Sequence, residues 1–184
     1  MYYIDNIGDQ AIDSVGGGTD RIYASISYIL AAGQEIEGLL ASSGTIGITL
    51  DGNAFDNSIV GGAGNDTLNG GNGNDELIGG AGNDIFLFDS QFIGVRNVDT
   101  ISDFDVTKDI IQLDHTCFPG LAFSQLSAAA FAVGSASGTA PQIVYDISTG
   151  SLSYDNNGAD AGGRSQFARL INTLSIQATN FLVV

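Results

Sequence analysis

The stretch that decides the fold is GGAGNDTLN at 61–69, GGNGNDELI at 70–78 and GGAGNDIFL at 79–87. These three nonapeptides follow one another without a gap and share the pattern G-G-x-G-x-D-x-U-x, in which U is a large apolar residue. A degenerate copy, GNAFDNSIV at 52–60, precedes them in register and has Asn57 in the place of the aspartate. Tandem repetition at this period predicts a stack of short, equivalent turns and strands.

Each repeat divides into six residues of turn and three residues of strand. Glycine at the first, second and fourth positions lets the turn take backbone angles that a Cβ would hinder. The strand then carries one inward apolar residue, which is Leu68, Leu77 or Phe86 in successive copies. Two repeats make one coil, so we expect turns to stack alternately on two edges, with 61–66 over 79–84. The sequence therefore predicts an all-β fold: a right-handed parallel β-roll followed by a β-rich C-terminal cap.

The stacked turns bring carboxylates and backbone carbonyls together. We expect Asp66 and Asp84 to supply the anionic ligands of one ion, and Asp75 to do so on the opposite edge. A flexible, all-oxygen cage suits Ca²⁺ better than Mg²⁺, which keeps its waters, or Zn²⁺, which prefers nitrogen and sulfur. Three perfect tandem copies disfavour the alternative that Gly-Asn-Asp runs are linker turns. The turn residues assigned to these calcium sites are Asn57, Gly61, Gly62, Ala63, Gly64, Asp66, Gly70, Gly71, Asn72, Gly73, Asp75, Gly79, Gly80, Ala81, Gly82 and Asp84.

Composition agrees with a cation-binding chain. Among the 184 residues, 21 Asp and Glu stand against 5 Lys and Arg, which gives a net charge of −16 and disfavours nucleic acid as a partner. A single Cys excludes an internal disulfide, so a metal is the alternative staple. No stretch approaches 18 apolar residues, and the N-terminal sequence lacks a basic and an apolar signal region. We therefore expect no membrane span and no N-terminal export signal.

At these residues the chain resembles the RTX (repeats-in-toxin) family, including the C-terminal domains of serralysin-type metalloproteases. The segment FLFDSQFIGVRNVDTISDFDVTKDIIQLD at 86–114 is similar to the closing segment of that family. The resemblance implies that Asp99, Asp103 and Asp109 complete the last calcium sites. Near the N-terminus, GGGTDRI at 16–22 resembles the spacer after an earlier set of repeats, and its Asp20 parallels Asp99.

The resemblance also implies an organisation and a role. We expect a degenerate RTX-like spacer at 1–51, the calcium-binding roll at 52–113, and at 114–184 a cap with an uncleaved type I secretion signal. Such a module would bind several calcium ions, fold outside the bacterial cell, and support type I secretion of a larger protein through an attached N-terminal domain. An extracellular adhesin or a carbohydrate-binding RTX module is the alternative. A catalytic cap is a third reading, which the lack of an acid, base and nucleophile cluster disfavours.

Other motifs carry less weight. His115 and Cys117 could form a nucleophilic pair or half a zinc site, but no third ligand is indicated by spacing. No catalytic motif is present, so we expect no enzyme activity. The run from Asp155 to Asp160 lacks the acid at position five, the Gly at position six and the Glu at position twelve of an EF-hand loop, which favours a polar hairpin turn.

Two local structures are predicted in the last third of the chain. Ile143 to Tyr145 and Leu152 to Tyr154 alternate in strand fashion around Ser-Thr-Gly, which is a hairpin signal. The tract SQLSAAAFAV at 124–133 is rich in alanine and is the best helix candidate, with Leu126 and Phe131 able to face a core.

Overall fold

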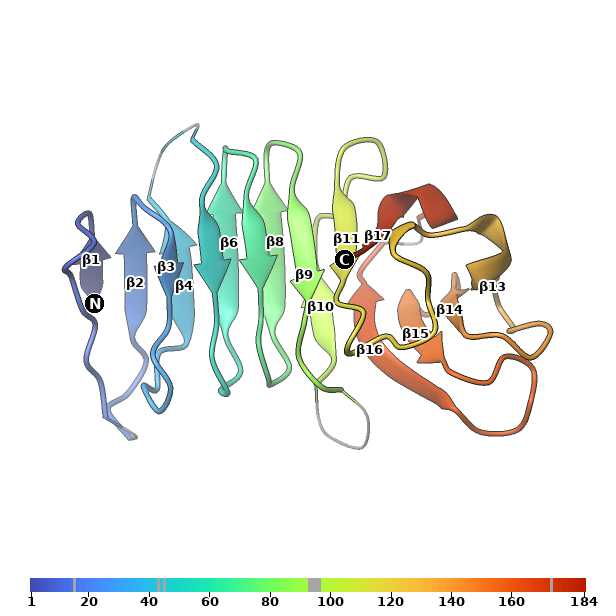
Figure 1. Ribbon diagram of the computed structural model, residues 1–184. Helices are drawn as coiled ribbons and strands as arrows, with labels where there is room; N and C mark the ends of the chain where they lie inside the picture. Colours follow the sequence, from blue (N-terminus) through green and yellow to red (C-terminus); the bar gives the residue numbers. More distant parts are fainter. Residues whose placement is uncertain (15, 43, 45, 93–96, 173) are drawn as a thin grey trace.

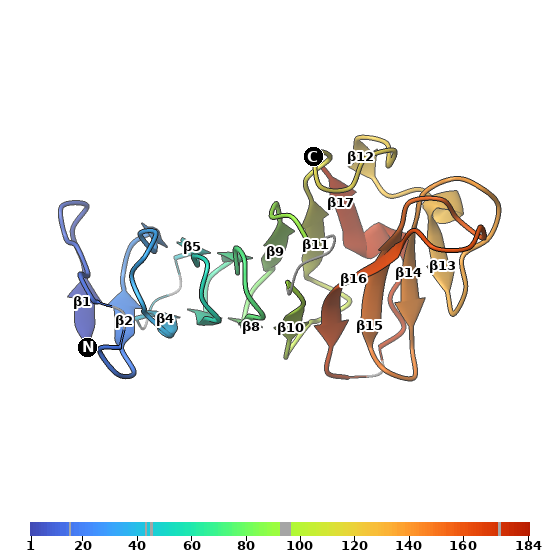
Figure 2. The same ribbon diagram turned by 90° about the horizontal axis from the view of Figure 1, so that it is seen from below.

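The computed structural model describes residues 1–14, 16–42, 44, 46–92, 97–172 and 174–184. Its strands form two sheets that face each other, with one end of the roll at β1 and the cap at the other end (Figures 1 and 2). In spatial order, the first sheet contains β1 (Tyr2–Ile4), β2 (Arg21–Ala24), β4 (Gly38–Ala41), β6 (Ser58–Gly62), β8 (Glu76–Gly80), β10 (Asp99–Ile101), β16 (Arg164–Leu170), β15 (Ser151–Asp155), β14 (Gln142–Asp146) and β13 (Phe131–Val133). The second contains β12 (Ser124–Gln125), β17 (Phe181–Val183), β11 (Ile110–Leu113), β9 (Ile85–Phe88), β7 (Thr67–Asn69), β5 (Thr49–Asp51) and β3 (Tyr28–Ile29).

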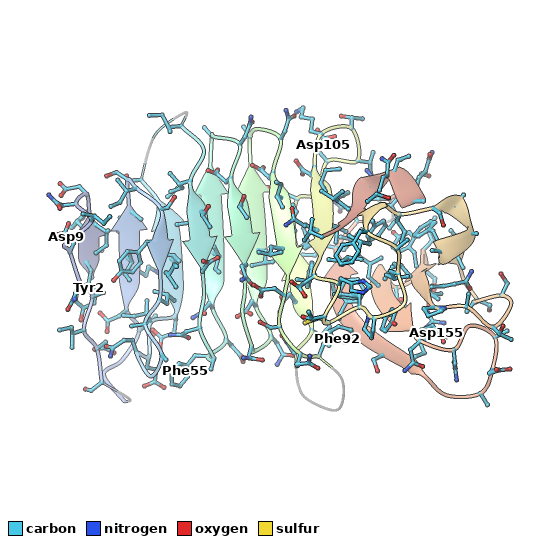
Figure 3. All side chains as sticks on the ribbon, viewed as in Figure 1. Tyr2, Asp9, Phe55, Phe92, Asp105 and Asp155 are labelled. Carbon is cyan, nitrogen blue, oxygen red and sulfur yellow. The ribbon has the colours of Figure 1, made fainter. Side chains whose placement is uncertain are left out.

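The predicted β-roll is confirmed. From β2 to β11 the chain passes alternately between the two sheets, and all strand pairs from β1 to β11 are parallel. In one sheet Thr67 pairs with Ile85, which places the turn at 61–66 over the turn at 79–84 as the repeat predicts. We call the edge that carries these two turns the upper edge, and the edge that carries the turns at 52–57 and 70–75 the lower edge. Figure 3 marks the two edges with Asp105 above and Phe55 below.

The core of the roll consists of two ladders of apolar side chains, one from each sheet. Because strand side chains alternate between faces, one residue of each short strand points inward. Leu68, Leu77 and Phe86 are the inward residues of the three repeats, and each is completely buried as predicted. The ladder of the first sheet is Ile22, Leu39, Ile59, Leu77, Ile101 and Leu170, and that of the second is Leu50, Leu68, Phe86, Ile111 and Phe181.

The N-terminal strands extend the same ladders beyond the repeats. Ile22 pairs with Leu39 and Leu39 with Ile59, which are 17 and 20 residues apart, whereas within the repeats Leu68 pairs with Phe86, 18 residues away. The coils before residue 58 thus differ in length from one another but keep the inward register. Burial of one apolar residue per strand, rather than a fixed count of residues, maintains this register.

The cap continues both sheets and closes the roll. Strand β16 pairs in parallel with β10, and β17 pairs in parallel with β11, so each sheet gains a strand from the end of the chain. The predicted hairpin is present as antiparallel β14 and β15. Rings from the roll and the cap meet in one cluster, in which the Phe167 centroid lies 5.1 Å from that of Phe88 and 5.0 Å from that of Phe118.

The helix predicted at 124–133 is wrong. Strand β12 opens this tract, and a single 3-10 turn, η1 (Ala128–Ala130), leads into β13. Leu126 is buried and the Phe131 ring packs on Phe181, so the two apolar residues reach the core from extended segments. Packing against the last strand therefore overrides the helix propensity of three alanines. A second 3-10 turn, η2 (Ala178–Asn180), precedes β17. Among the described residues, no helix is long and apolar enough to cross a membrane.

Candidate metal-binding turns

Aspartates on the upper edge form a ladder that joins successive coils. The backbone N–H of Ile48 donates to Oδ1 of Asp66 at 2.8 Å, and the N–H of Asp66 donates to Oδ1 of Asp84 at 2.9 Å. The N–H of Asp84 in turn donates to Oδ1 of Asp109 at 3.0 Å. Each carboxylate is therefore held in place by a backbone N–H group of the preceding coil.

The lower edge repeats this arrangement with Asp75. The N–H of Asn57 donates to Oδ1 of Asp75 at 2.7 Å, and the N–H of Asp75 donates to Oδ1 of Asp99 at 3.2 Å. The structure thus places Asp66 and Asp84 together on one edge and Asp75 on the other, as the repeat predicts.

The second oxygen of each repeat aspartate has no partner. Asp66, Asp75 and Asp84 are 1%, 2% and 1% exposed, and Oδ2 of each is buried without a hydrogen bond. Leaving a buried carboxylate oxygen unpaired costs on the order of 1–3 kcal/mol or more, because the water that it loses is not replaced. Three equivalent orphaned oxygens in one motif indicate places built for a cation.

Glycine keeps the space beside these oxygens open. A Cβ on the first glycine of each repeat would lie 2.7 Å (Gly61), 2.2 Å (Gly70) or 2.4 Å (Gly79) from Oδ2 of the aspartate in its own turn. A Cβ on Gly61 would also lie 2.7 Å from the carbonyl oxygen of Gly79 in the stacked turn. A carboxylate oxygen and a carbonyl oxygen therefore border the same space between two turns.

The donor set fits calcium. In the described part of the chain, no three His, Cys, Asp or Glu side chains gather as a metal-binding group. A cation between the turns would meet the backbone carbonyl oxygens that border this space, with the orphaned Oδ2 atoms as candidate anionic ligands. Calcium accepts such flexible oxygen cages, whereas zinc favours histidine nitrogen and cysteine sulfur ligands, which these turns lack.

The turns can stack this closely only because glycine also occupies the second and fourth positions. Gly80 and Gly82 have φ angles of +94° and +150°. A Cβ on Gly80 would lie 2.0 Å from the carbonyl oxygen of Gly62, and a Cβ on Gly82 would lie 1.9 Å from that of Gly64. Ala63, Asn72 and Ala81 are exposed, and the backbone N–H groups of Asn72 and Ala81 donate to the carbonyl oxygens of Asn53 and Gly62 in the stacked turns.

The buried carboxyls resist ionisation in the absence of a cation. Burial raises the pKa of Asp66, and it raises that of Asp84 to about 6. Burial also raises the pKa values of Asp75 and Asp99, and the adjacent Asp99 charge raises that of Asp75 further. A divalent cation beside the orphaned oxygens would reverse these shifts, since it favours the charged form.

The other aspartates assigned from the resemblance lie near the turns with different partners. Asp103 accepts the N–H of Gly79 at 2.9 Å on one oxygen and that of Gly80 at 2.7 Å on the other. Asp109 uses its second oxygen to accept the N–H of Asp105 at 2.8 Å. These carboxylates bind turn amides directly, and their calcium role stays a prediction.

Asp20 directly precedes β2 and Asp99 is the first residue of β10, and the residues at this position form one column along the lower edge. The strand register aligns Arg21, Gly38, Ser58, Glu76 and Thr100, so the residues before them align as well. Oδ1 of Asp20 accepts a hydrogen bond from the Met1 amino group at 2.9 Å. Sequence reasoning missed Glu37, which also occupies this column, because unequal coil lengths hide it from a nine-residue search. A register count from Leu39 would have found it.

His115 and Cys117 do not share a site. Nδ1 of His115 lies 2.9 Å from the carbonyl oxygen of Leu121, and its ring packs on Phe123. The Cys117 thiol is buried and donates to the carbonyl oxygen of Asp89 at 3.1 Å. Both residues belong to turns that close the roll.

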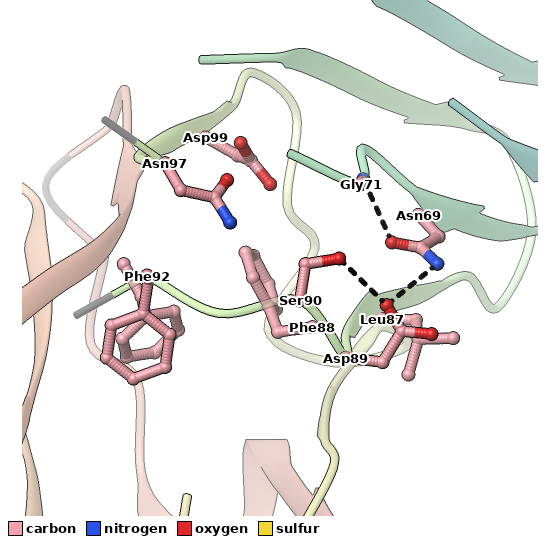
Figure 4. Close-up of a pocket in the computed structure, with 10 residues that line it drawn as sticks. Asn69, Gly71, Leu87, Phe88, Asp89, Ser90, Phe92, Asn97 and Asp99 are labelled. Carbon is pink, nitrogen blue, oxygen red and sulfur yellow. Dashed lines mark hydrogen bonds between the residues drawn. The ribbon is translucent and has the colours of Figure 1, made fainter. Parts of the chain in front are cut away.

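A small cavity adjoins Asp99 where the roll meets the cap (Figure 4). On one side, the Asn69 amide accepts the N–H of Gly71 and donates to Asp89, both at 3.1 Å. Asp99 and the Phe92 ring line it on another side. Phe88 of the roll and Phe167 of the cap also line the cavity, so it lies between Asp99 and the ring cluster that joins the two parts.

Comparison with known proteins agrees with this geometry. Residues 51–86 match the family model of the RTX calcium-binding nonapeptide repeat, in four copies. This segment therefore belongs to the RTX calcium-binding repeat family, which indicates calcium binding. The four copies cover the three perfect repeats and the degenerate copy before them. No curated protein matches the chain.

Proposed function

We propose that the chain is a calcium-dependent folding module. The observation that carries this proposal is the set of buried, unpartnered Oδ2 atoms of Asp66, Asp75 and Asp84. Without a cation, their burial opposes folding at neutral pH. With calcium bound, each ion neutralises the turn carboxylates and joins stacked coils, so binding free energy becomes folding free energy.

We propose further that this switch serves secretion of a larger protein. RTX repeats are associated with secreted proteins, and extracellular calcium modules bind at about 10⁻⁴ to 10⁻³ M. A chain with affinities in this range would stay unfolded in a calcium-poor cytoplasm and fold outside the cell. In that setting the module acts through folding and not through catalysis, and it stabilises an attached N-terminal domain.

The burial of the last strand supports export before folding. Phe181 is completely buried in β17, and Val183 is 2% exposed. An export machine that reads this C-terminal segment must bind it before β17 pairs with β11. The folded chain would hide a type I signal, and the unfolded chain would present it.

Small-angle scattering tests the folding part of the proposal. For this length, a compact fold gives a radius of gyration of about 16 Å and an unfolded chain about 46 Å. We expect values toward the larger figure in EDTA and toward the smaller in calcium, with magnesium unable to substitute. A compact chain in EDTA would contradict the proposal.

An export assay tests the secretion part. In cells that carry a type I exporter, we expect the full chain to reach the medium and a chain without 181–184 to stay inside at equal cellular abundance. Equal export of both chains would contradict a C-terminal signal.

A further inference from the structure

Asn57 differs from the repeat aspartates in that both of its polar side-chain atoms have partners. It is 3% exposed, and its Oδ1 accepts the N–H of Asn53 at 3.0 Å. Its Nδ2 donates to the carbonyl oxygen of Ile36, in the preceding coil, at 2.6 Å. Asp75 is the next member of the same column and has an orphaned Oδ2. Along this column, the side chain at residue 57 is fully hydrogen-bonded, whereas the side chain at residue 75 has an unpartnered oxygen.

At Asn57 the side-chain hydrogen bond to the preceding coil runs in the opposite direction. Asp66 receives the N–H of Ile48 on its carboxylate, whereas Asn57 gives an N–H to a carbonyl. The peptide group that joins Ile36 to Glu37 thus presents its oxygen to the column. An aspartate at position 57 would place a carboxylate oxygen against that carbonyl with no proton between them, which is costly in a buried place.

Direct hydrogen bonds continue along the lower edge on the N-terminal side of Asn57. Nδ2 of Asn53 donates to the carbonyl oxygens of Ala31 at 3.2 Å and Gln34 at 2.7 Å. One coil further, Oε2 of Glu37 accepts the N–H of Asp20 at 2.7 Å. Side-chain amides and one carboxylate thus join the lower-edge turns that calcium would otherwise have to join.

The apolar ladder supports these coils independently of any ion. Ile22, Leu39 and Ile59 are completely buried and stack on one another across β2, β4 and β6. On the upper edge, the N–H of Ser42 donates to the carbonyl oxygen of Ala24 at 2.7 Å. The coils at 20–57 therefore have both a core and a bonded lower edge, whereas in the first coil Oδ2 of Asp13 is buried without a hydrogen bond.

We propose that the coils at 20–57 stack without calcium and form a preformed seed, onto which the calcium-dependent coils at 61–113 fold. Asn57 marks the boundary: its amide takes the place of an ion, and it is not a calcium ligand. This inference rests on the proposed function, because a seed has meaning only if the remaining coils require calcium.

Hydrogen exchange of the full chain, read by mass spectrometry, tests the proposal. In EDTA we expect the amides of β4 (Gly38–Ala41) to exchange slower than those of β8 (Glu76–Gly80) by about tenfold or more. In calcium, both strands become protected. Equally fast exchange of both strands in EDTA, with protection of both in calcium, overturns the seed and leaves the proposed function intact. Equal protection of both strands in EDTA, or of neither strand in calcium, overturns both.

A reciprocal pair of variants tests the boundary. Asn57→Asp should raise the exchange rate of the β4 amides in EDTA by about tenfold, because it replaces the donor to Ile36 with a carboxylate. Asp75→Asn should leave the protection of β4 in EDTA unchanged and raise the calcium concentration needed to protect β8. Protection of β4 that is unchanged in Asn57→Asp, or lost in Asp75→Asn, would contradict the assignment.

Discussion

Asp66 donates its backbone N–H to Oδ1 of Asp84 at 2.9 Å, while Oδ2 of both residues is buried and unpartnered. One oxygen of each carboxylate therefore holds the coils in register and the other is left for a cation. The same aspartate therefore serves both structure and binding, through different oxygens, and mutation can separate the two roles.

Asp84→Asn separates them. An asparagine oxygen can still accept the N–H of Asp66, but the charge opposite the cation is lost. We expect the calcium midpoint to rise by about tenfold or more, since calcium affinity follows the number of charged ligands. Stability in chelator should increase, because a buried carboxylate is removed. Asp160→Asn, at an exposed position in the cap, is the matched control and should change neither quantity. Isothermal calorimetry and urea unfolding give both quantities, and an unchanged calcium midpoint in Asp84→Asn would contradict the assignment.

Acid should partly replace calcium. Burial raises the pKa values of Asp75 and Asp99 and raises that of Asp84 to about 6. A group whose folded pKa is raised contributes stability that is present below its unfolded pKa, near 4, and is lost as pH rises through the folded pKa. In chelator, β-structure should therefore be more stable at pH 5 than at pH 8. Calcium should reverse the order, because its ligands must be ionised. Thermal unfolding at both pH values checks this, and higher stability at pH 8 in chelator would count against it.

Close stacking of the turns depends on Gly80. Gly80→Ala combines a positive φ with a Cβ placed 2.0 Å from the carbonyl oxygen of Gly62. Gly33→Ala is the matched control, because Gly33 has a φ of +81° and open space around it. We expect the control to lose about 1 kcal/mol of unfolding free energy from backbone strain alone, and Gly80→Ala to lose about 3 kcal/mol or more. Equal losses, measured by urea unfolding in calcium, would show that stacking is not tight.

The cap should assist calcium-driven folding through its aromatic contact with the roll. Phe167 is 1% exposed, and its ring packs edge-on against Phe88 of β9. Truncation of such a buried ring costs about 3–5 kcal/mol. We expect Phe167→Ala to raise the calcium concentration needed to fold β9, measured by hydrogen exchange. A raised exchange rate confined to the cap would mean that the two parts fold independently.

The repeats alone predicted the architecture of the roll, the inward residues and the placement of the aspartates on two edges. These features follow from a strict nine-residue period, which a sequence displays directly. The role of Glu37 and the partners of Asn57 were not predictable in this way, because the N-terminal coils vary in length and their bonds depend on how the peptide at 36–37 is turned. The predicted helix at 124–133 failed for a related reason: only the folded chain shows that Phe181 offers Phe131 a partner.

The central claim is that calcium makes this chain fold. Far-UV circular dichroism during a calcium titration after EDTA treatment, with magnesium as the control, tests it most directly. We predict a cooperative gain of β signal with calcium and none with magnesium. A spectrum that is already β-rich in EDTA and does not change with calcium would contradict the account.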